Sequence, residues 1–482
     1  MSLTLTLALL LVAPALQEPA AAEPARPNIL LLFADDQRSD SLGAYGNALA
    51  RTPVIDALAA RGFTFRANYC FGSIHGAVCQ PSRAMLLSGR TLWRVPMNLA
   101  GVTTLPMALR AAGYETFLSG KWHNGEAAAV RSFERGASIF FGGMCDHTKV
   151  PVRDLEEGTL GPKRTGKAFS SELFADATLD FLRGRDRARP FFAMVSFTAA
   201  HDPRQPPEPY RSQAYEDLPP LPKNFLPQHP FDNGWLVGRD ENLLPWPRPE
   251  SMVRQQLAEY QALVHHLDAQ VGRIVATLDE LGLTENTLVV YTADHGLALG
   301  SHGLLGKQSV YEHSMGCPLI VAGPGVPRGE SAALTYLLDL CPTLCEVGGA
   351  EPPAGVEGAS LAPLWRGERA RVRDNLFLAY ENSQRSVRDA RFKLTRYPLI
   401  DLEQLFDLQA DPAELQDLRG DPAHAEDATR LGAELKGWQV RVADPHPLRV
   451  DEPKPRAIDL TGRARKPDQW QPAWIVEKYF GQ

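Results

Sequence analysis

Ile29-Leu30-Leu31-Leu32-Phe33-Ala34 is a continuous apolar run that ends in two carboxylates, Asp35-Asp36. A strand with one face in water alternates apolar and polar residues, whereas a strand buried on both faces is apolar throughout. The run therefore predicts a central strand of a parallel sheet. Three further runs have the same character and end in polar residues: 116–119 before Gly120-Lys121-Trp122-His123, 191–197 before His201, and 288–291 before Asp294-His295.

Helical patterns lie between these runs. Residues 53–60 end at Arg61-Gly62, and residues 254–281 repeat apolar side chains at steps of three and four. Strands that alternate with helices predict an α/β fold with a mainly parallel sheet between helices. Ligands bind beyond the carboxyl ends of the strands in such sheets, so we expect the polar residues after the runs to meet there.

Beyond about residue 370 the alternation of long apolar runs and helical patterns gives way to shorter segments. We expect a main domain over 27–370 and a smaller C-terminal α+β subdomain with a tail over 371–482. Segments 387–394 and 404–408 predict short antiparallel strands, and 411–414 predicts a turn that leads into a helix.

Composition limits the possible classes of partner. The chain has 482 residues and a formal net charge of −7. It therefore lacks the excess of basic residues that is typical of nucleic-acid-binding proteins, and we expect no nucleic-acid partner. Residues 1–22 combine an apolar run with Ala20-Ala21-Ala22, which predicts a signal peptide and a periplasmic or secreted product. No later apolar stretch is long enough to span a membrane. Six cysteines leave disulfide pairing open, although Cys341 and Cys345 are spaced like small core residues of one helix.

The segment Cys79-Gln80-Pro81-Ser82-Arg83 to Gly89 carries the strongest chemical signal. Pro81 is suited to open a helix that continues to Leu87, which places Cys79 at the positive end of the helix dipole. Arg83 lies one turn further along and is expected to reach the same anion. Taken alone, the segment would favour a buried cysteine before an ordinary helix.

A second cluster indicates a metal site. Asp35-Asp36 and Asp294-His295 each follow a predicted strand, and a cation would offset the repulsion between their carboxylates. Carboxylate oxygens favour a hard ion such as calcium or magnesium.

These motifs together resemble the type I, formylglycine-dependent sulfatase family of the alkaline phosphatase superfamily. The family signature is Cys-x-Pro-x-Arg with a following Gly, and the resemblance runs from residue 27 to about 418. It implies an alkaline-phosphatase-like fold. It also implies that a formylglycine-generating enzyme converts Cys79 to formylglycine (3-oxoalanine), whose hydrate is the nucleophile. Calcium, with magnesium as the less expected ion, would be held by Asp35, Asp36, Asp294, His295 and the modified Cys79.

The resemblance also assigns roles to residues that would otherwise be ordinary surface or structural groups. Arg83, Lys121 and Lys307 would neutralise the sulfuryl oxygens, where preorganised charge stabilises the transition state most. His201, with Lys307, would protonate the leaving oxygen, and His123 would be the base that allows sulfate to be eliminated. His302, in Ser-His-Gly, is a weaker candidate for the pocket lining and is given no role in the chemistry. One departure is Gly316-Cys317-Pro318, where many relatives carry an Arg before a valine-proline step.

The expected activity is removal of sulfate from a sulfated carbohydrate, with choline sulfate and aryl sulfates as other substrates. The alternatives are a phosphonate monoester or phosphodiester hydrolase and a catalytically silent carbohydrate-binding relative. Residues 203–250 are rich in proline and predict a loop over the site. Its aromatic residues are expected either to stack on sugar or to pack the loop onto the body: Tyr210, Phe225, Phe231, Trp235 and Trp246.

Overall fold

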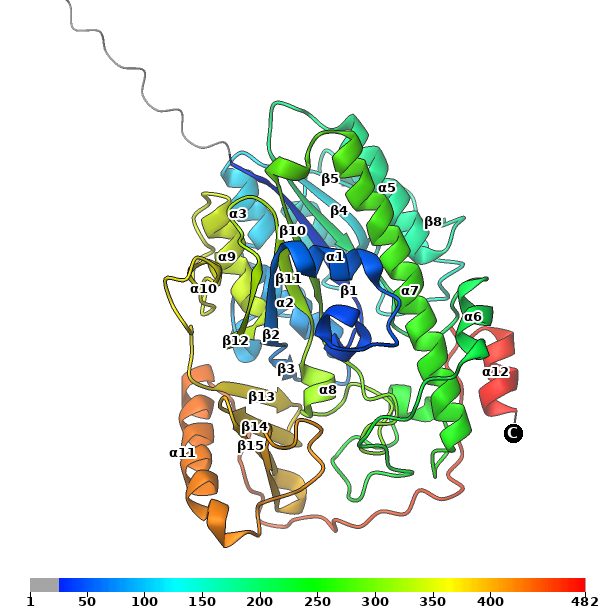
Figure 1. Cartoon of the computed structure of the whole chain (residues 1–482), viewed down its shortest axis with the longest axis vertical. Helices are drawn as coiled ribbons and strands as arrows, with labels where there is room; N and C mark the ends of the chain where they lie inside the picture. Colours follow the sequence, from blue (N-terminus) through cyan, green and yellow to red (C-terminus); the bar gives the residue numbers. More distant parts are fainter. Residues whose placement is uncertain (1–25, 482) are drawn as a thin grey trace, which may run out of the picture.

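The computed structural model of the chain describes residues 26–481. Its centre is an 11-stranded sheet in the order β12-β2-β11-β10-β1-β9-β4-β5-β6-β7, with β8 paired to β6 (Figure 1). The strands are β1 Asn28–Ala34, β2 Phe63–Tyr69, β4 Glu115–Lys121, β5 Arg135–Phe140, β6 Pro151–Glu156, β7 Thr159–Leu160, β8 Arg164–Thr165, β9 Phe191–Ser196, β10 Thr287–Ala293, β11 Leu319–Ala322 and β12 Gly329–Tyr336.

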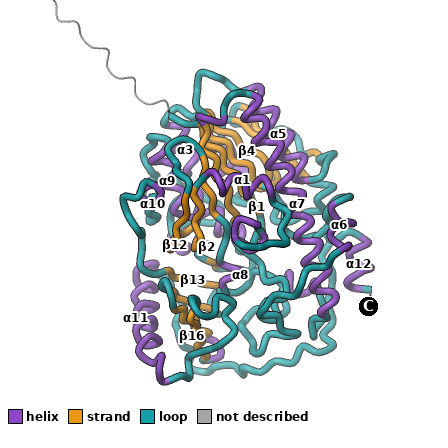
Figure 2. The backbone as a smooth tube through the Cα atoms, in the orientation of Figure 1, coloured by secondary structure: helices purple, strands orange, loops and turns teal. Residues whose placement is uncertain are grey.

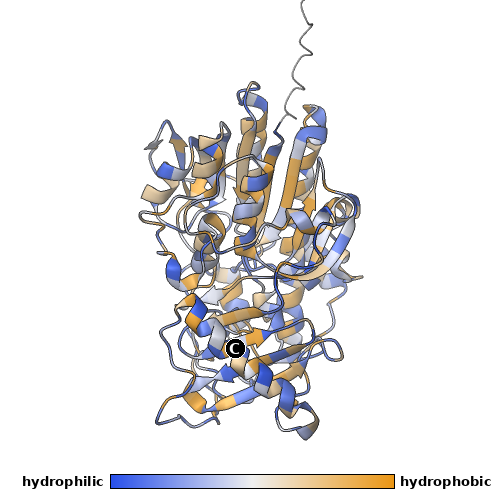
Figure 3. Cartoon of the chain, turned by 90° about the vertical axis from the view of Figure 1, so that its left-hand side faces the viewer, coloured by the Kyte–Doolittle hydropathy of each residue, from blue (hydrophilic) through white to orange (hydrophobic). Residues whose placement is uncertain are grey.

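The four predicted apolar runs are the middle of this sheet. Strand β1 pairs in parallel with β10 on one side and β9 on the other, and β9 pairs in parallel with β4. The sheet is therefore mainly parallel, as predicted, while β11 and β6 add antiparallel pairs towards its two edges. The central strands are strongly hydrophobic in Figure 3.

Both faces of the sheet are covered. Ile29, Leu31 and Phe33 of β1 belong to one core cluster, while Leu30 and Leu32 belong to the other. This split explains why the run has no polar position: every side chain of the strand faces a core. The first cluster includes residues of helices α2 Cys79–Ser88, α3 Leu105–Ala111, α4 Glu126–Ser132, α9 Leu340–Val347 and α10 Ala362–Trp365. The second includes residues of α1 Pro53–Arg61, α5 Ser170–Gly184 and α7 Glu250–Glu280.

A smaller sheet forms the C-terminal subdomain. Its order is β16-β15-β14-β13-β3, with β3 Gly72–Ser73, β13 Leu376–Tyr380, β14 Gln384–Arg388, β15 Phe392–Tyr397 and β16 Leu402–Asp407. The predicted antiparallel strands are present, and helix α11 Ala425–Val442 packs against the sheet.

The helix predicted directly after 411–414 does not form there. The Asp411 carboxylate accepts hydrogen bonds from the backbone N–H groups of Leu415 (2.6 Å) and Gln416 (2.8 Å). Side-chain acceptors of this kind compete with the helical backbone pattern, and helical structure begins only with the short helix η8 Pro422–His424, which leads into α11.

The chain after α11 crosses to the opposite side of the molecule. This segment, residues 443–481, is called the C-terminal strap. It runs as a long irregular path along the base in Figure 1 and as loop in Figure 2, and it ends in α12 Ala473–Phe480 beside α6 Tyr210–Glu216 and α7. None of the helices within residues 26–481 combines the length and apolar character that crossing a bilayer needs. The predicted leader, 1–22, lies outside the described residues.

All six cysteines lie within the described residues, and each is buried as a free thiol. Cys341 and Cys345 are fully buried in α9, which confirms their predicted place in a helix.

Candidate active site

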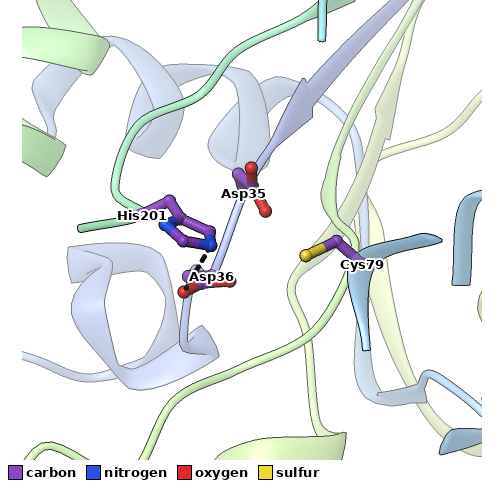
Figure 4. Close-up of side chains that lie close together, drawn as sticks. All are labelled: Asp35, Asp36, Cys79 and His201. Atoms are coloured by element: carbon purple, nitrogen blue, oxygen red, sulfur yellow. Dashed lines mark ion pairs between the residues drawn. The ribbon is translucent and has the colours of Figure 1, made fainter. Parts of the chain in front are cut away.

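Residues far apart in the sequence meet at one end of the large sheet. Asp35 and Asp36 follow β1, Asp294 and His295 follow β10, and His201 comes a few residues after β9. Because β1, β9 and β10 run in parallel, their carboxyl ends lie at the same edge. Figure 4 shows the side chains of Asp35, Asp36 and His201 around a common space, with the thiol of Cys79 directed into it.

Cys79 is the first residue of helix α2, so the helix begins two residues before the predicted start at Pro81. Gly89 ends the helix in a left-handed conformation (φ 66°), and its N–H donates to the Met85 carbonyl at 2.8 Å. Burial alone would raise the pKa of the Cys79 thiol, but the ammonium groups of Lys121 and Lys307 lower it well below its usual value. The site therefore stabilises negative charge at this position.

The predicted metal ligands form a compact group. One ligand atom from each of Asp35, Cys79, Asp294 and His295 lies within 4.8 Å of all the others, and Asp36 joins a similar group with Asp35, Cys79 and His201. Burial raises the pKa of both Asp35 and Asp36, which shows that these carboxylates lack solvation.

Two buried atoms of this group make no hydrogen bond, Asp35 Oδ1 and His295 Nε2. His295 Nε2 lies 3.3 Å from Asp36 Oδ1 and 3.5 Å from Asp294 Oδ1. Three carboxylates at this spacing, with one oxygen and one nitrogen atom of the group unpartnered, fit a divalent cation, which would supply the charge and the contacts that these atoms require.

Basic side chains surround the acidic group. Lys307 Nζ donates to the carboxylate of Asp36 at 2.7 and 2.8 Å, and Lys121 Nζ donates to Asp35. All these groups are fully or almost fully buried. A tetrahedral anion that enters this space would meet ammonium donors at the positive end of α2.

Arg83 is placed differently from the prediction. It is fully buried, and its Nε and Nη2 donate to Asp294 Oδ2 while Nη1 donates to the Lys121 carbonyl and to Ser196 Oγ. Because these donors are engaged, Arg83 reaches the site through Asp294, whose carboxylate it orients.

The two histidines of the predicted chemistry have opposite environments. Burial lowers the pKa of His201, but the charges of Asp36 and Asp202 outweigh this effect and raise it well above its usual value. His201 Nε2 lies 2.9 Å from Lys307 Nζ, and Nδ1 lies 2.8 Å from the Asp202 carbonyl. His123 is mostly buried, and burial lowers its pKa despite a side-chain hydrogen bond with Cys79. One imidazole is thus suited to donate a proton and the other to accept one.

Two acidic residues of the site were missed in the sequence. Oxygen atoms of Asp36, Asp202 and Asp240 lie within 4.8 Å of one another, and Asp240 Oδ2 is 3.7 Å from Lys307 Nζ. Asp202 directly follows His201, which was the one available signal. Asp240 lies in the proline-rich loop, in the short helix η4 Arg239–Leu243, and no motif marks it.

His302, the weaker candidate for the pocket lining, does not belong to the catalytic group. Its ring stacks on Tyr311 with centroids 4.0 Å apart, and Nε2 lies 3.0 Å from the Glu414 carbonyl. The backbone leaves the site after His295 and returns only at Lys307, which carries His302 into the packing between the two subdomains. Gly316, in the departure from the family pattern, lines a separate cavity that contains none of the catalytic group.

The aromatic residues of loop 203–250 mainly hold the loop in place. Phe231 packs edge-on against Tyr397, Tyr210 packs against His266, and Trp246 is buried beneath Arg248. The loop contributes Asp240 to the reaction centre, and its Trp235 ring packs against Gly76, three residues before Cys79, and edge-on against Tyr380.

Comparisons with known proteins agree with this geometry. Residues 27–350 match the family described as Sulfatase, and residues 300–441 match the family described as N-sulphoglucosamine sulphohydrolase, C-terminal. An N-acetylglucosamine-6-O-sulfatase of Bacteroides thetaiotaomicron is 27% identical, with 89% of each chain covered.

Solved structures share the fold. A structure described as BT4656 in complex with its substrate D-glucosamine-2-N,6-O-disulfate aligns with TM-score 0.75 and 24% identity, over 88% of this chain and 99% of that one. The phosphonate monoester hydrolase SpPMH from Silicibacter pomeroyi aligns with TM-score 0.68 and 25% identity, over 87% and 96%. The family match over more than half of the sequence places this chain in the sulfatase family of the alkaline phosphatase superfamily, and it is an enzyme that hydrolyses sulfate esters.

Proposed function

We propose that this sulfatase uses a formylglycine derived from Cys79, and a divalent metal ion, to remove sulfate from a sulfated carbohydrate. The observation that carries the proposal is the position of Cys79. It is buried at the first turn of α2, between the carboxylate group of Asp35 and Asp294 and the ammonium groups of Lys121 and Lys307.

Maturation requires a partner. Conversion of the Cys79 side chain to an aldehyde is a two-electron oxidation of Cβ with loss of the sulfur, and a formylglycine-generating enzyme supplies the oxidant. Addition of water to the aldehyde gives a geminal diol, which has one hydroxyl for attack on sulfur and a second for the later elimination.

The metal site is assigned to Asp35, Asp36, Asp294, His295 and residue 79. A bound ion would neutralise charge on the sulfuryl oxygens and favour the ionised hydroxyl of residue 79. The three carboxylates favour calcium over softer metals, and magnesium is the second choice because it accepts fewer protein ligands. Arg83 fixes the orientation of the Asp294 carboxylate, since both its Nε and Nη2 donate to Asp294 Oδ2.

The remaining residues have separate roles in the attack on sulfur, the protonation of the leaving oxygen and the elimination of sulfate. The attacking hydroxyl gives its proton to the Asp294 carboxylate. Lys121 and Lys307 bind the sulfuryl oxygens while the diol oxygen forms a new bond to sulfur and the bond from sulfur to the leaving oxygen breaks. His201 transfers its proton to that leaving oxygen. His123 then takes the proton of the second hydroxyl, the Cβ–O bond to sulfate breaks, and the aldehyde forms again. Serine at position 79 would have no second hydroxyl and would retain the sulfate.

Carbohydrate is proposed as the substrate class because the N-acetylglucosamine-6-O-sulfatase relative acts on a sugar, by its name. Choline sulfate and aryl sulfates are the other candidates for the assay. We assign the chemistry to residues 27–370 and expect residues 371–482 to cover the site. The predicted signal peptide, 1–22, would deliver the enzyme to the periplasm or the medium.

A phosphonate monoester or phosphodiester hydrolase is the second candidate, favoured by the similarity to SpPMH. Such esters also carry one negative charge on a tetrahedral centre, which two lysines and a metal ion would bind in the same way. A silent carbohydrate-binding role would not require the charged set at the strand ends, which is present in full.

The test is coexpression with a formylglycine-generating enzyme, followed by mass spectrometry of the Cys79 peptide and turnover assays. We expect the aldehyde mass and faster turnover of 4-nitrophenyl sulfate than of a phenyl phosphonate monoester. Cys79→Ser should fold normally and lose turnover. Full turnover by Cys79→Ser would refute the mechanism, and preference for the phosphonate would favour the second candidate.

A further inference from the structure

A cavity of about 340 Å³ lies beside the reaction centre. One wall comes from the loop before α7 and from the residue after His201, with Asp202, Arg239 and Asp240. The opposite wall comes from the end of the chain, with Lys466, Asp468 and Phe480. More than 220 residues of sequence separate the two walls, so this cavity exists only because the C-terminal strap crosses the molecule (Figure 1).

The strap is held by specific buried contacts. Glu259 of α7 is fully buried, and its Oε1 accepts hydrogen bonds from Tyr479 OH at 2.8 Å and Lys478 Nζ at 2.9 Å. Gln471 Nε2 donates to Asp202 Oδ2 at 3.0 Å. These contacts fix the strap directly against the residue that follows His201. The strap also lies outside the two segments of the chain that match family models, which end at residues 350 and 441.

The cavity is in the right place for the leaving group. Asp240 Oδ2 lies 3.7 Å from Lys307 Nζ, and the Asp202 carbonyl accepts from His201 Nδ1 at 2.8 Å. His201 is the residue that protonates the leaving oxygen in the proposed function, and this inference rests on that function. The part of the substrate that leaves with that oxygen must therefore occupy the space next to His201.

The polar groups of the cavity indicate what it binds. Asp240 is buried, yet its Oδ2 makes no hydrogen bond, which suits an acceptor for a sugar hydroxyl. Arg239 and Lys466 form no ion pair with any residue in the described part of the chain, and their side chains stand at the exposed rim. Asp202 is engaged by His201 and Gln471, and Asp468 accepts hydrogen bonds from Gln471 Nε2 and the Trp470 N–H. The rim therefore presents two cations, Arg239 and Lys466, whose charge no carboxylate of the described residues pairs within 4.0 Å.

We propose that Arg239, Asp240 and Lys466 select the substrate: a sulfated sugar that carries a second anionic group, a carboxylate or another sulfate. Asp240 accepts a hydrogen bond from a ring hydroxyl, and Lys466 and Arg239 bind the second anion. The strap is thereby a specificity element, and the sugar is enclosed between the loop before α7 and the C-terminal strap.

The test uses inhibition, because the product-like sugar occupies this cavity whatever the position of the scissile sulfate. The matured enzyme hydrolyses 4-nitrophenyl sulfate while glucuronate or glucose competes. We expect the inhibition constant of glucuronate to be about tenfold lower than that of glucose, as a charge-assisted hydrogen bond in a partly enclosed site provides. In Lys466→Glu this preference should disappear, and in Lys466→Met it should be reduced.

Lys436→Glu is the matched control. Lys436 is exposed on α11, away from the cavity, so the same charge reversal should keep the preference of the wild type. Equal inhibition by both sugars in the wild type, or an unchanged preference in Lys466→Glu, would overturn the inference while leaving sulfate hydrolysis in place. Failure of the matured enzyme to hydrolyse 4-nitrophenyl sulfate would instead count against the proposed function.

Discussion

Replacing His201 with alanine tests the division of labour in the site most directly. The imidazole is 2% exposed, its Nδ1 is fixed by the Asp202 carbonyl at 2.8 Å, and Asp36 and Asp202 raise its pKa well above the usual value in spite of burial. It is therefore held in one orientation, beside carboxylates that favour its protonated form. General acid catalysis of this kind contributes about 10²–10⁴-fold to a rate.

The structure sets where in that range the effect should fall. Lys307 Nζ lies 2.9 Å from His201 Nε2, so a second proton donor remains close to the leaving oxygen in the variant. We expect kcat/KM to fall about 10²-fold for a sulfated sugar, whose alcohol leaves poorly without a proton, which is the lower end of the range for a general acid. For 4-nitrophenyl sulfate the loss should stay within about tenfold, because nitrophenolate is a stable leaving group.

The assay compares kcat/KM for the two substrates in the wild type and in His201→Ala, with metal content measured in both. His302→Ala is the control, because it removes another buried imidazole that packs on Tyr311 outside the site. The control should change both substrates equally. Equal losses for both substrates in His201→Ala would refute the role as a general acid and leave His201 as a positioning residue.

Three further predictions concern the metal ion and the stability of the fold. Chelation should lower the melting temperature and turnover together, since an ion present at a hundredfold excess over its Kd stabilises the folded state by about 3 kcal/mol. Asp294→Ala should remove the bound metal, and an unchanged metal stoichiometry would show that the ion is bound elsewhere. Asp268 accepts hydrogen bonds from the backbone N–H groups of Val54 and Ile55, and burial raises its pKa from 3.8 to about 6. A raised carboxyl pKa means that the folded protein binds the proton more tightly, so this group favours folding below pH 4 and loses that contribution as the pH rises through 6. Asp268→Asn should therefore gain up to about 3 kcal/mol relative to the wild type between pH 4 and pH 7 in urea unfolding. A constant difference across that range would contradict the assignment.

The part of the fold that could be predicted from the sequence is the part with strong periodicity. The run 29–34 has no polar position because its strand faces two cores, and α7 repeats its apolar residues along one face for its whole length. The strands outside the four apolar runs were not predicted, since short segments such as β11 do not distinguish a strand from a loop. Within the site, Asp35 and Asp294 were marked by their position after such runs.

Asp240 and Lys466 could not be found in the same way. Neither follows a strand or lies in a periodic segment, and each reaches the site at the end of a long irregular path. The positions of such paths depend on single tertiary contacts, for example the buried carboxylate of Glu259 that binds Tyr479. Periodicity in a sequence reflects the repeated burial of one face of a helix or strand. A single buried hydrogen bond gives no such periodicity, so it cannot be predicted in the same way.

The pairing of β3 with β13 connects the small subdomain to the nucleophile. Gly72 and Ser73 pair in parallel with Ala379 and Tyr380, only six residues before Cys79. A Cβ atom on Gly72 would lie 1.8 Å from the Ala379 carbonyl oxygen, and its φ of +123° is unfavourable for other residues, so this close approach requires glycine. The C-terminal sheet thus includes the segment that leads into α2, and the place of Cys79 depends on residues 371–482 as well as on the main sheet. The C-terminal part of the chain therefore contacts the site at two places. Strand β13 pairs with β3, which precedes Cys79, and the C-terminal strap contacts Asp202 through Gln471.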